Sequence, residues 1–309
     1  MERKLIKQGG GGFTIYLPKK WIDKKGLKEG DEIKIEEVGN SLFIDSAIRD
    51  NKEIIIKINE QNKKDISVIL THIYRKGYNQ VLIENINSGL FKEISLVTSD
   101  LLLGFEITEK SETKCKLENI SEPAEQKYDL IIRKIFFLVN EFNDLIVKDL
   151  NNYKNYDEIK QIKKNLDKFL LFCRRILIKE KYEKDPVSEW EFLTFLTHIG
   201  HSYFYSYKYA KENKMKISEN IKSLFGKLKN YFNLLEESYL NKNIEKIHKI
   251  NQLKEEYHFG EIINLLENSK GKDAVFISYI GDIFRFIQLG SSPVLSQILE
   301  KNQMSISAS

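Results

Sequence analysis

Thr14-Ile15-Tyr16-Leu17-Pro18-Lys19-Lys20-Trp21, followed by Gly26-Leu27-Lys28-Glu29-Gly30-Asp31-Glu32-Ile33, is the stretch that decides the fold of the N-terminal region. With its flanks it predicts a strand, a Gly-rich turn, a strand, one short helix and two further strands around a tight turn, ending near Asp45. Pro18 suits the first turn of a helix because its missing N–H would have no intrahelical partner there. Gly26 is placed to end that helix in a left-handed conformation, which leaves room for about two turns.

So small a unit is close to the lower size limit for independent folding, which is roughly 40 residues without metals, disulfides or a partner. The segment contains no cysteine. The sequence therefore predicts an intertwined dimer.

Charge divides this segment into two parts. Residues 1–28 carry eight basic side chains against two acidic ones, a net charge of +6, whereas residues 29–45 carry one against six, a net charge of −5. A basic face presented twice by a two-fold dimer would meet phosphates on both strands of a duplex.

The Tyr-Leu-Pro-Lys-Lys-Trp run and the Gly-Leu-Lys-Glu-Gly-Asp-Glu-Ile run resemble the AbrB/SpoVT-type swapped-hairpin DNA-binding domain. The resemblance implies a β domain over residues 1–48 that dimerises and binds double-stranded DNA. The residues expected at DNA are Lys19, Lys20 and Lys24 on phosphates, joined by Arg3, Lys4 and Lys7, with Thr14 and Tyr16 as hydroxyl contacts. The alternative is a dimerisation module that does not contact DNA.

The whole chain has 309 residues, is 30% charged and 41% hydrophobic, and carries a net charge of only +4, so the distribution of charge is more informative than its sum. Cys115 and Cys173 are far apart in sequence and are expected to be free thiols in a reducing cytosol. No apolar run is long enough for a transmembrane helix, and the N-terminus lacks the apolar core of a signal peptide. We therefore expect a cytoplasmic protein without membrane insertion.

Residues 49–121 predict a small α/β layer. Strands are expected at 53–58, 80–84, 105–109 and 114–119, and helices at 65–76, closed by Gly77, and at 91–103, ended by Gly104. No Gly-rich phosphate loop follows a strand, so a nucleotide site is not expected. We expect this layer to couple the other two parts and to help dimerise them.

Residues 122–300 predict an all-α region. The expected helices are 123–150, 155–182, 187–211, 217–240, 242–268 and 273–289, and Asp185-Pro186 is a plausible helix start. Short breaks make neighbouring helices antiparallel, which gives two successive three-helix groups, 122–211 and 217–290. The tail at 301–309 is expected to be disordered.

Gly104-Phe105-Glu106-Ile107 followed by paired three-helix bundles resembles PhoU, the phosphate-uptake regulator, and residues 73–78 add to the likeness. The order of hairpin domain, α/β layer and bundles is similar to the archaeal PhoU-type regulators. This resemblance implies phosphate homeostasis as the context, and a transporter or signalling protein as the partner of the helical domain.

The same resemblance implies metal-binding carboxylates, which the chain mostly lacks. The acidic pair expected on the second helix falls on Asn165-Leu166-Asp167, and acids of the third fall near Thr197 and His201. In the second bundle Glu255 and Glu256 would face Gly281 and Arg285, with Asp282 nearby. A surviving site would need Asp167, His198 and His201, but we expect both histidines at the core edge or surface, and neither a metal nor a cofactor.

Other motifs favour structural explanations. The aromatic segment from His201 to Tyr209 is expected to pack in the core or a dimer interface, because its rings point around a helix and form no single stacking platform. Arg174 and Arg175 are expected on a solvated face. No Gly-x-Ser-x-Gly, Walker or Cys-x-x-Cys motif is present, so an enzyme is not expected.

Three functions agree with these features. The first is a dimeric DNA-binding transcription regulator whose PhoU-like domain senses a signal or binds a partner, with a link to phosphate metabolism. The second is a protein-interaction regulator of a phosphate transporter or sensor kinase that dimerises through the hairpin domain without binding DNA. The third is an antitoxin-like role, against which the ordered helical C-terminus counts.

Overall fold

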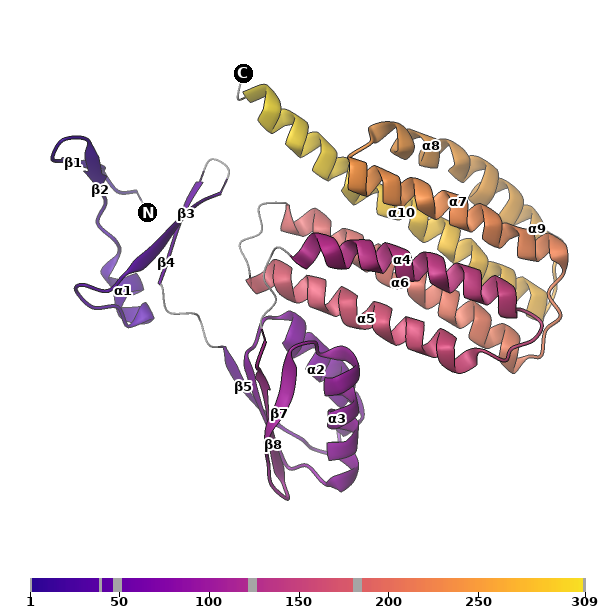
Figure 1. The fold of residues 1–309 in the computed structure, drawn as a ribbon, viewed down its shortest axis with the longest axis horizontal. Helices are drawn as coiled ribbons and strands as arrows, with labels where there is room; N and C mark the ends of the chain where they lie inside the picture. Colours follow the sequence, from indigo (N-terminus) through magenta and orange to yellow (C-terminus); the bar gives the residue numbers. More distant parts are fainter. Residues whose placement is uncertain (1, 39–40, 47–51, 122–126, 180–184, 308–309) are drawn as a thin grey trace. The chain divides into compact units, whose positions relative to one another are not determined.

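The computed structural model describes residues 2–38, 41–46, 52–121, 127–179 and 185–307, with only the backbone of Glu36, Val38 and residues 301–307. The chain divides into two compact units, residues 1–51 and 52–309 (Figure 1). The sequence placed boundaries at 48/49 and 121/122. The α/β layer and the helices belong to the same one of these two units.

The N-terminal unit has the predicted order of elements. They are β1 (Ile6–Gln8), β2 (Gly12–Thr14), α1 (Lys19–Lys25), β3 (Ile33–Val38) and β4 (Ser41–Ser46). β1 pairs with β2, and β3 pairs with β4, both antiparallel. Gly26 follows α1 with φ of 66°, and its N–H donates to the Asp23 carbonyl at 3.2 Å, which confirms the predicted helix end.

This unit has almost no core within one chain. Leu27 is its one buried apolar residue among those described. Seven large apolar side chains that belong inside a domain are 43–69% exposed: Leu5, Ile6, Phe13, Ile15, Ile35, Leu42 and Phe43.

The α/β layer opens the second unit. Its elements are β5 (Glu53–Lys57), a 3₁₀ turn (Lys63–Asp65), α2 (Ile66–Arg75), β6 (Gln80–Glu84), α3 (Ser88–Leu101), β7 (Phe105–Lys110) and β8 (Lys114–Asn119). The sheet order is β5-β6-β8-β7, with β5 parallel to β6 and the other pairs antiparallel. α2 and α3 lie on one side of this sheet (Figure 1). α3 begins before the predicted residue 91 because the Asn87 side chain caps it, accepting from the Leu90 N–H at 2.9 Å.

The helical region contains α4 (Tyr128–Asp149), α5 (Tyr156–Lys179), α6 (Pro186–Glu212), α7 (Glu219–Asn241), α8 (Ile244–Lys254), the π-helical segment η3 (Glu255–Ile262), α9 (Ile263–Glu267) and α10 (Lys272–Ser307). Asp185 caps α6, accepting from the N–H of Val187 at 2.9 Å, with Pro186 in the first turn, as predicted. α4, α5 and α6 pack on one another, but α10 packs on α6 as well as on α7 and α8. The helices therefore share one core, and separate three-helix bundles are not confirmed.

The predicted end of the last helix was wrong. α10 does not stop at residue 289 but continues through Pro293 to Ser307, so residues 301–307 of the expected disordered tail are helical. Val294 and Ile298 are buried there, and packing outweighs the hydrogen bond lost at proline. Residues 308 and 309 of that prediction lie outside the described residues.

A buried arginine joins the α/β layer to the helices. Arg175 of α5 is 1% exposed, and its guanidinium donates to the carbonyls of Tyr74 and Tyr78 at 2.9 and 2.8 Å. It also donates to the side chain of Asn79 at 3.0 Å. Tyr74 is in the last turn of α2 and the other two acceptors follow its end, where carbonyls lack helical partners and a cation is favoured. The prediction that this arginine lies on a solvated face was wrong.

The aromatic segment of α6 packs mainly in the core, as predicted. Tyr203 and Tyr207 are 0% exposed and Phe204 is 8% exposed, whereas Tyr205 is 43% exposed. The Tyr207 hydroxyl donates to Asp149, and the Tyr203 hydroxyl donates to Asn143 at 3.1 Å.

Candidate nucleic-acid interface

The β1–β2 hairpin is shaped by its glycines. Gly9 and Gly11 have φ of 66° and 133°, conformations that L side chains rarely adopt, so the Gly-rich turn is required. The register pairs Ile6 with Thr14 and Lys7 with Phe13.

This register separates two predicted DNA contacts. Cross-strand partners lie on the same face and successive residues alternate, so Lys7 and Thr14 lie on opposite faces of the hairpin. The Thr14 hydroxyl donates to the Gln8 side chain. A DNA surface that uses both Lys7 and Thr14 must therefore approach the hairpin along its edge or tip.

α1 presents three of the predicted contacts. Lys19, Lys20 and Lys24 are exposed, and Lys20 and Lys24 are one helical turn apart. Lys25 differs, because its ammonium lies 3.3 Å from the Asp45 carboxylate on β4. α1 therefore offers a lysine pair for an external anion and uses a third lysine within the unit.

The remaining predicted contacts, Arg3, Lys4 and Tyr16, are also exposed, with Tyr16 at 70%. Arg3 and Lys4 precede β1, and Tyr16 follows β2. All eight predicted DNA contacts are thus accessible within one chain, although they belong to three different local segments.

Asp167, His198 and His201, the possible metal ligands, do not converge. His201 Nε2 lies 2.9 Å from Asp167 Oδ1, and Lys163 donates to Asp167 Oδ2 at 2.6 Å. His198 is exposed and stacks on Phe286 with ring centroids 4.9 Å apart, as expected for a surface histidine. Within the described residues no cluster of three His, Cys, Asp or Glu side chains could hold a metal ion.

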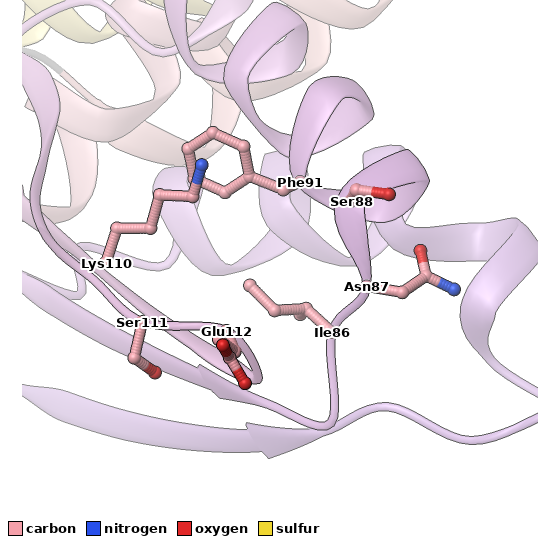
Figure 2. Close-up of a pocket in the computed structure, with 7 residues that line it drawn as sticks. All are labelled: Ile86, Asn87, Ser88, Phe91, Lys110, Ser111 and Glu112. Atoms are coloured by element: carbon pink, nitrogen blue, oxygen red, sulfur yellow. The ribbon is translucent and has the colours of Figure 1, made fainter.

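A surface hollow lies in the α/β layer between the start of α3 and the β7–β8 turn (Figure 2). Its lining is Ile86, Asn87, Ser88, Phe91, Lys110, Ser111 and Glu112. Lys110 lies over the Phe91 ring at 3.7 Å, Asn87 caps α3, and Ser111 accepts from the Lys114 N–H at 3.1 Å. These polar groups have partners within the protein and do not define a ligand.

Arg174, like Arg175, is buried, contrary to the prediction. It was expected on a solvated face but is 6% exposed on α5. The informative signal was the surrounding sequence, Leu170-Leu171-Phe172-Cys173 and Ile176-Leu177, which is apolar on both sides.

Residues 2–38 and 41–46 have the order of elements expected for an AbrB/SpoVT-like domain, with two antiparallel strand pairs, one on each side of a short helix, and little core of their own. Residues 6–53 match the family model described as "Antidote-toxin recognition MazE, bacterial antitoxin". The match is confined to the N-terminal segment, ends at the first residue of β5, and leaves the rest of the chain unassigned.

No curated protein matches the chain, and no solved structure matches it. None of the helices in the described ranges has the length and apolar composition needed to cross a bilayer.

Proposed function

We propose that this protein is a dimeric, DNA-binding transcription regulator and not an enzyme. The observation that carries the proposal is the N-terminal unit itself. It matches a family of the swapped-hairpin type, leaves its lysines accessible and cannot bury its apolar side chains alone.

Dimerisation follows from the exposed apolar surface of that unit. Each of the seven exposed side chains, from Leu5 to Phe43, would contribute about 1–3 kcal/mol if fully buried. A second copy of the unit supplies a complementary surface, because both copies lack the same core. Pairing would also present α1 and its lysines twice.

For the helical part we propose a PhoU-like role, in which it receives a signal or binds a transporter or signalling protein in phosphate homeostasis. Support comes from the succession of α4–α5–α6 and α7–α8–α10, and from the resemblance of this order to archaeal PhoU-type regulators. The proposed protein acts in the cytoplasm, where its DNA is.

An antitoxin-like role is the second candidate, favoured by the description of the matching family as a bacterial antitoxin. In that case part of the chain would bind and neutralise a toxin. The long ordered helical region distinguishes this chain from antitoxins that end in a short flexible segment. A protein-interaction regulator that dimerises without touching DNA is the third.

Charge reversal on α1 tests the proposal. Lys19→Glu with Lys20→Glu should abolish binding to duplex DNA, because it replaces two phosphate contacts per chain with repulsion. Binding of the unaltered protein to random-sequence duplex is followed by fluorescence anisotropy between about 50 and 200 mM salt. The logarithm of affinity should fall by about 0.9 per phosphate contacted for each tenfold rise in salt.

The matched control is Lys63→Glu with Lys64→Glu, which makes the same charge change on two adjacent lysines of the second unit. This control should bind DNA nearly as well as the unaltered protein, and light scattering should show the same dimer for all three proteins. Equal loss of affinity in both double variants would show that DNA affinity depends only on net charge, and it would contradict the assignment of α1 as the DNA-binding surface. Absence of DNA binding by the unaltered dimer would favour the two protein-binding functions.

A further inference from the structure

Arg174 and Arg75 approach the same indole ring from two elements of the second unit. The guanidinium carbon of Arg174, on α5, lies 5.5 Å from the Trp190 ring centroid, and that of Arg75, at the end of α2, lies 6.0 Å from it. Two like charges beside one ring repel each other, and neither forms an ion pair with a carboxylate of the described residues. The polar contact of Arg75 is with a neutral or cationic ring, since one of its terminal nitrogens lies 2.8 and 2.7 Å from the two ring nitrogens of His72.

Arg174 is poorly compensated for a buried cation. One of its terminal nitrogens donates to the hydroxyls of Thr194 and Thr197, both at 3.2 Å. Those hydroxyls donate in turn to the carbonyls of Trp190 and Leu193, which fixes their oxygens as acceptors for Arg174. Its Nε is buried without a hydrogen-bond partner in the described structure, so the guanidinium group of Arg174 has an N–H that could donate to a ligand.

Asp167, the carboxylate whose charge acts on Arg174, does not neutralise this pair. Asp167 acts on Arg174 at longer range, but His201 occupies one of its oxygens and Lys163 the other. Burial lowers the pKa of Arg174 to about 10, with the charge of Arg75 as the next cause. Burial also lowers the pKa of His198, and Arg174 adds to that shift.

The pair of Arg174 and Arg75 is unfavourable in free energy unless an anion binds beside it, because a desolvated charge needs an opposite charge or full hydrogen bonding. Guanidinium forks match the oxygen geometry of phosphate, and two of them match its double charge. We propose that Arg174 and Arg75, which both lie beside the Trp190 ring, form a binding site for a phosphate dianion. The site belongs to the second unit and does not depend on DNA binding.

Isothermal titration of the full-length protein with inorganic phosphate, at constant ionic strength set with chloride, tests the site. We expect saturable binding of one phosphate per chain. Arg75→Gln should weaken it at least about tenfold, since one charge-assisted interaction contributes roughly 1.5–3 kcal/mol. Arg174→Lys, which keeps the charge but loses the fork, should weaken it as well.

Arg133→Gln is the matched control, because it removes one exposed arginine from α4 and leaves the site intact. It should bind phosphate like the unaltered protein. Arg75 is only half-buried, so its variant is expected to fold, and its melting curve without phosphate checks this. Absence of saturable binding up to about 10 mM phosphate, well beyond millimolar affinity, would overturn the proposal. Equal affinity of Arg75→Gln and Arg133→Gln would overturn it too.

Phenyl phosphate distinguishes two sources of the anion. Affinity equal to that of inorganic phosphate would support a free phosphate ion as the ligand. Tighter binding, with a change in Trp190 fluorescence in a Trp21→Phe background, would support a phosphate group carried on a larger molecule that touches the indole.

Discussion

Arg174 and Arg175 are adjacent on α5 but differ in how well their charges are compensated. Arg175 donates to two carbonyls and one side-chain amide, and it joins the helices to the end of α2. Arg174 has two hydroxyls and a second arginine near it. Two turns earlier on the same helix, Asp167 is held by His201 and Lys163.

The Asp167 carboxylate should make stability depend on pH. Burial alone would raise its pKa, but the hydrogen bond with His201 and the charge of Lys163 outweigh burial and hold the pKa below its usual range. A carboxyl with a lowered pKa stabilises the fold above its unfolded pKa of about 3.9, and this contribution is lost as pH falls through the folded value. Urea unfolding of Asp167→Asn should therefore show a weaker loss of stability on acidification than the unaltered protein.

Asp144→Asn is the control for that measurement. Asp144 is 56% exposed and pairs with Lys229 at 2.6 Å, and exposed ion pairs contribute little to stability. Its pH profile should follow that of the unaltered protein. Identical profiles for both variants would show that Asp167 is not the source of the acid dependence.

At the scale of elements, two helical glycines have contrasting environments. A Cβ added at Gly200 of α6 would lie 2.1 Å from a methyl carbon of Leu166 on α5, whereas one added at Gly226 of α7 would have no neighbour within 4 Å. Gly200 therefore permits the close approach of α5 and α6, and Gly226 has no such role.

Alanine at these two positions should change stability in opposite directions. Gly200→Ala should lower the free energy of unfolding by about 1–3 kcal/mol, because Leu166 must move within a packed core. Gly226→Ala should raise it by about 0.5–1 kcal/mol, since alanine loses less backbone entropy in a helix. Chemical denaturation measures both, and stabilisation by Gly200→Ala would contradict the close approach.

Element types and order were predictable from the sequence because periodicity and local stop signals agree there. Gly26, Gly77 and Asp185-Pro186 end or begin helices where predicted. The end of α10 was not predictable, because Gly290 and Pro293 are local break signals that packing of Val294 overrides. The split of the fifth expected helix by η3 has no local signal that we identify.

The two candidate sites also differ in how far the sequence alone could predict them. Lysines in a short basic segment can be read directly from the sequence, and those predicted to contact DNA are accessible in the structure. The Arg75–Arg174 pair could not be predicted, because it joins residues that lie far apart along the chain. The distance between them depends on how α2 meets α5.

At the scale of the whole chain, the second unit should unfold as one block. The buried core is continuous from the sheet to α10, and Arg175 ties the layer to the helices. Its two cysteines lie in different parts, Cys115 in β8 and Cys173 in α5, and both are buried. Burial raises the pKa of Cys115 to about 11 and that of Cys173 well above its usual value.

Thiol labelling can test this cooperativity, since the thiolate is the reactive form and both thiols are shielded in the native state. The variants Cys115→Ala and Cys173→Ala each keep one thiol. In both variants that thiol should become reactive at the urea concentration at which the variant itself unfolds. Circular dichroism monitors the unfolding of the helices. Labelling of Cys115 at urea concentrations well below those at which the helices unfold would show that the α/β layer opens independently.

Under the proposed dimerisation, the small core of the N-terminal unit would make the number of protein copies in the cell important for function. For a unit that completes its core only by pairing, the concentration of dimers at low abundance is proportional to the square of the chain concentration. Halving synthesis would therefore remove about three quarters of the dimers. Binding to a genomic site would then follow gene dosage and dilution by growth more steeply than it would for a regulator that folds as a single chain. The exposed apolar side chains of this unit would thereby set a concentration threshold below which the protein is present but does not bind its genomic site.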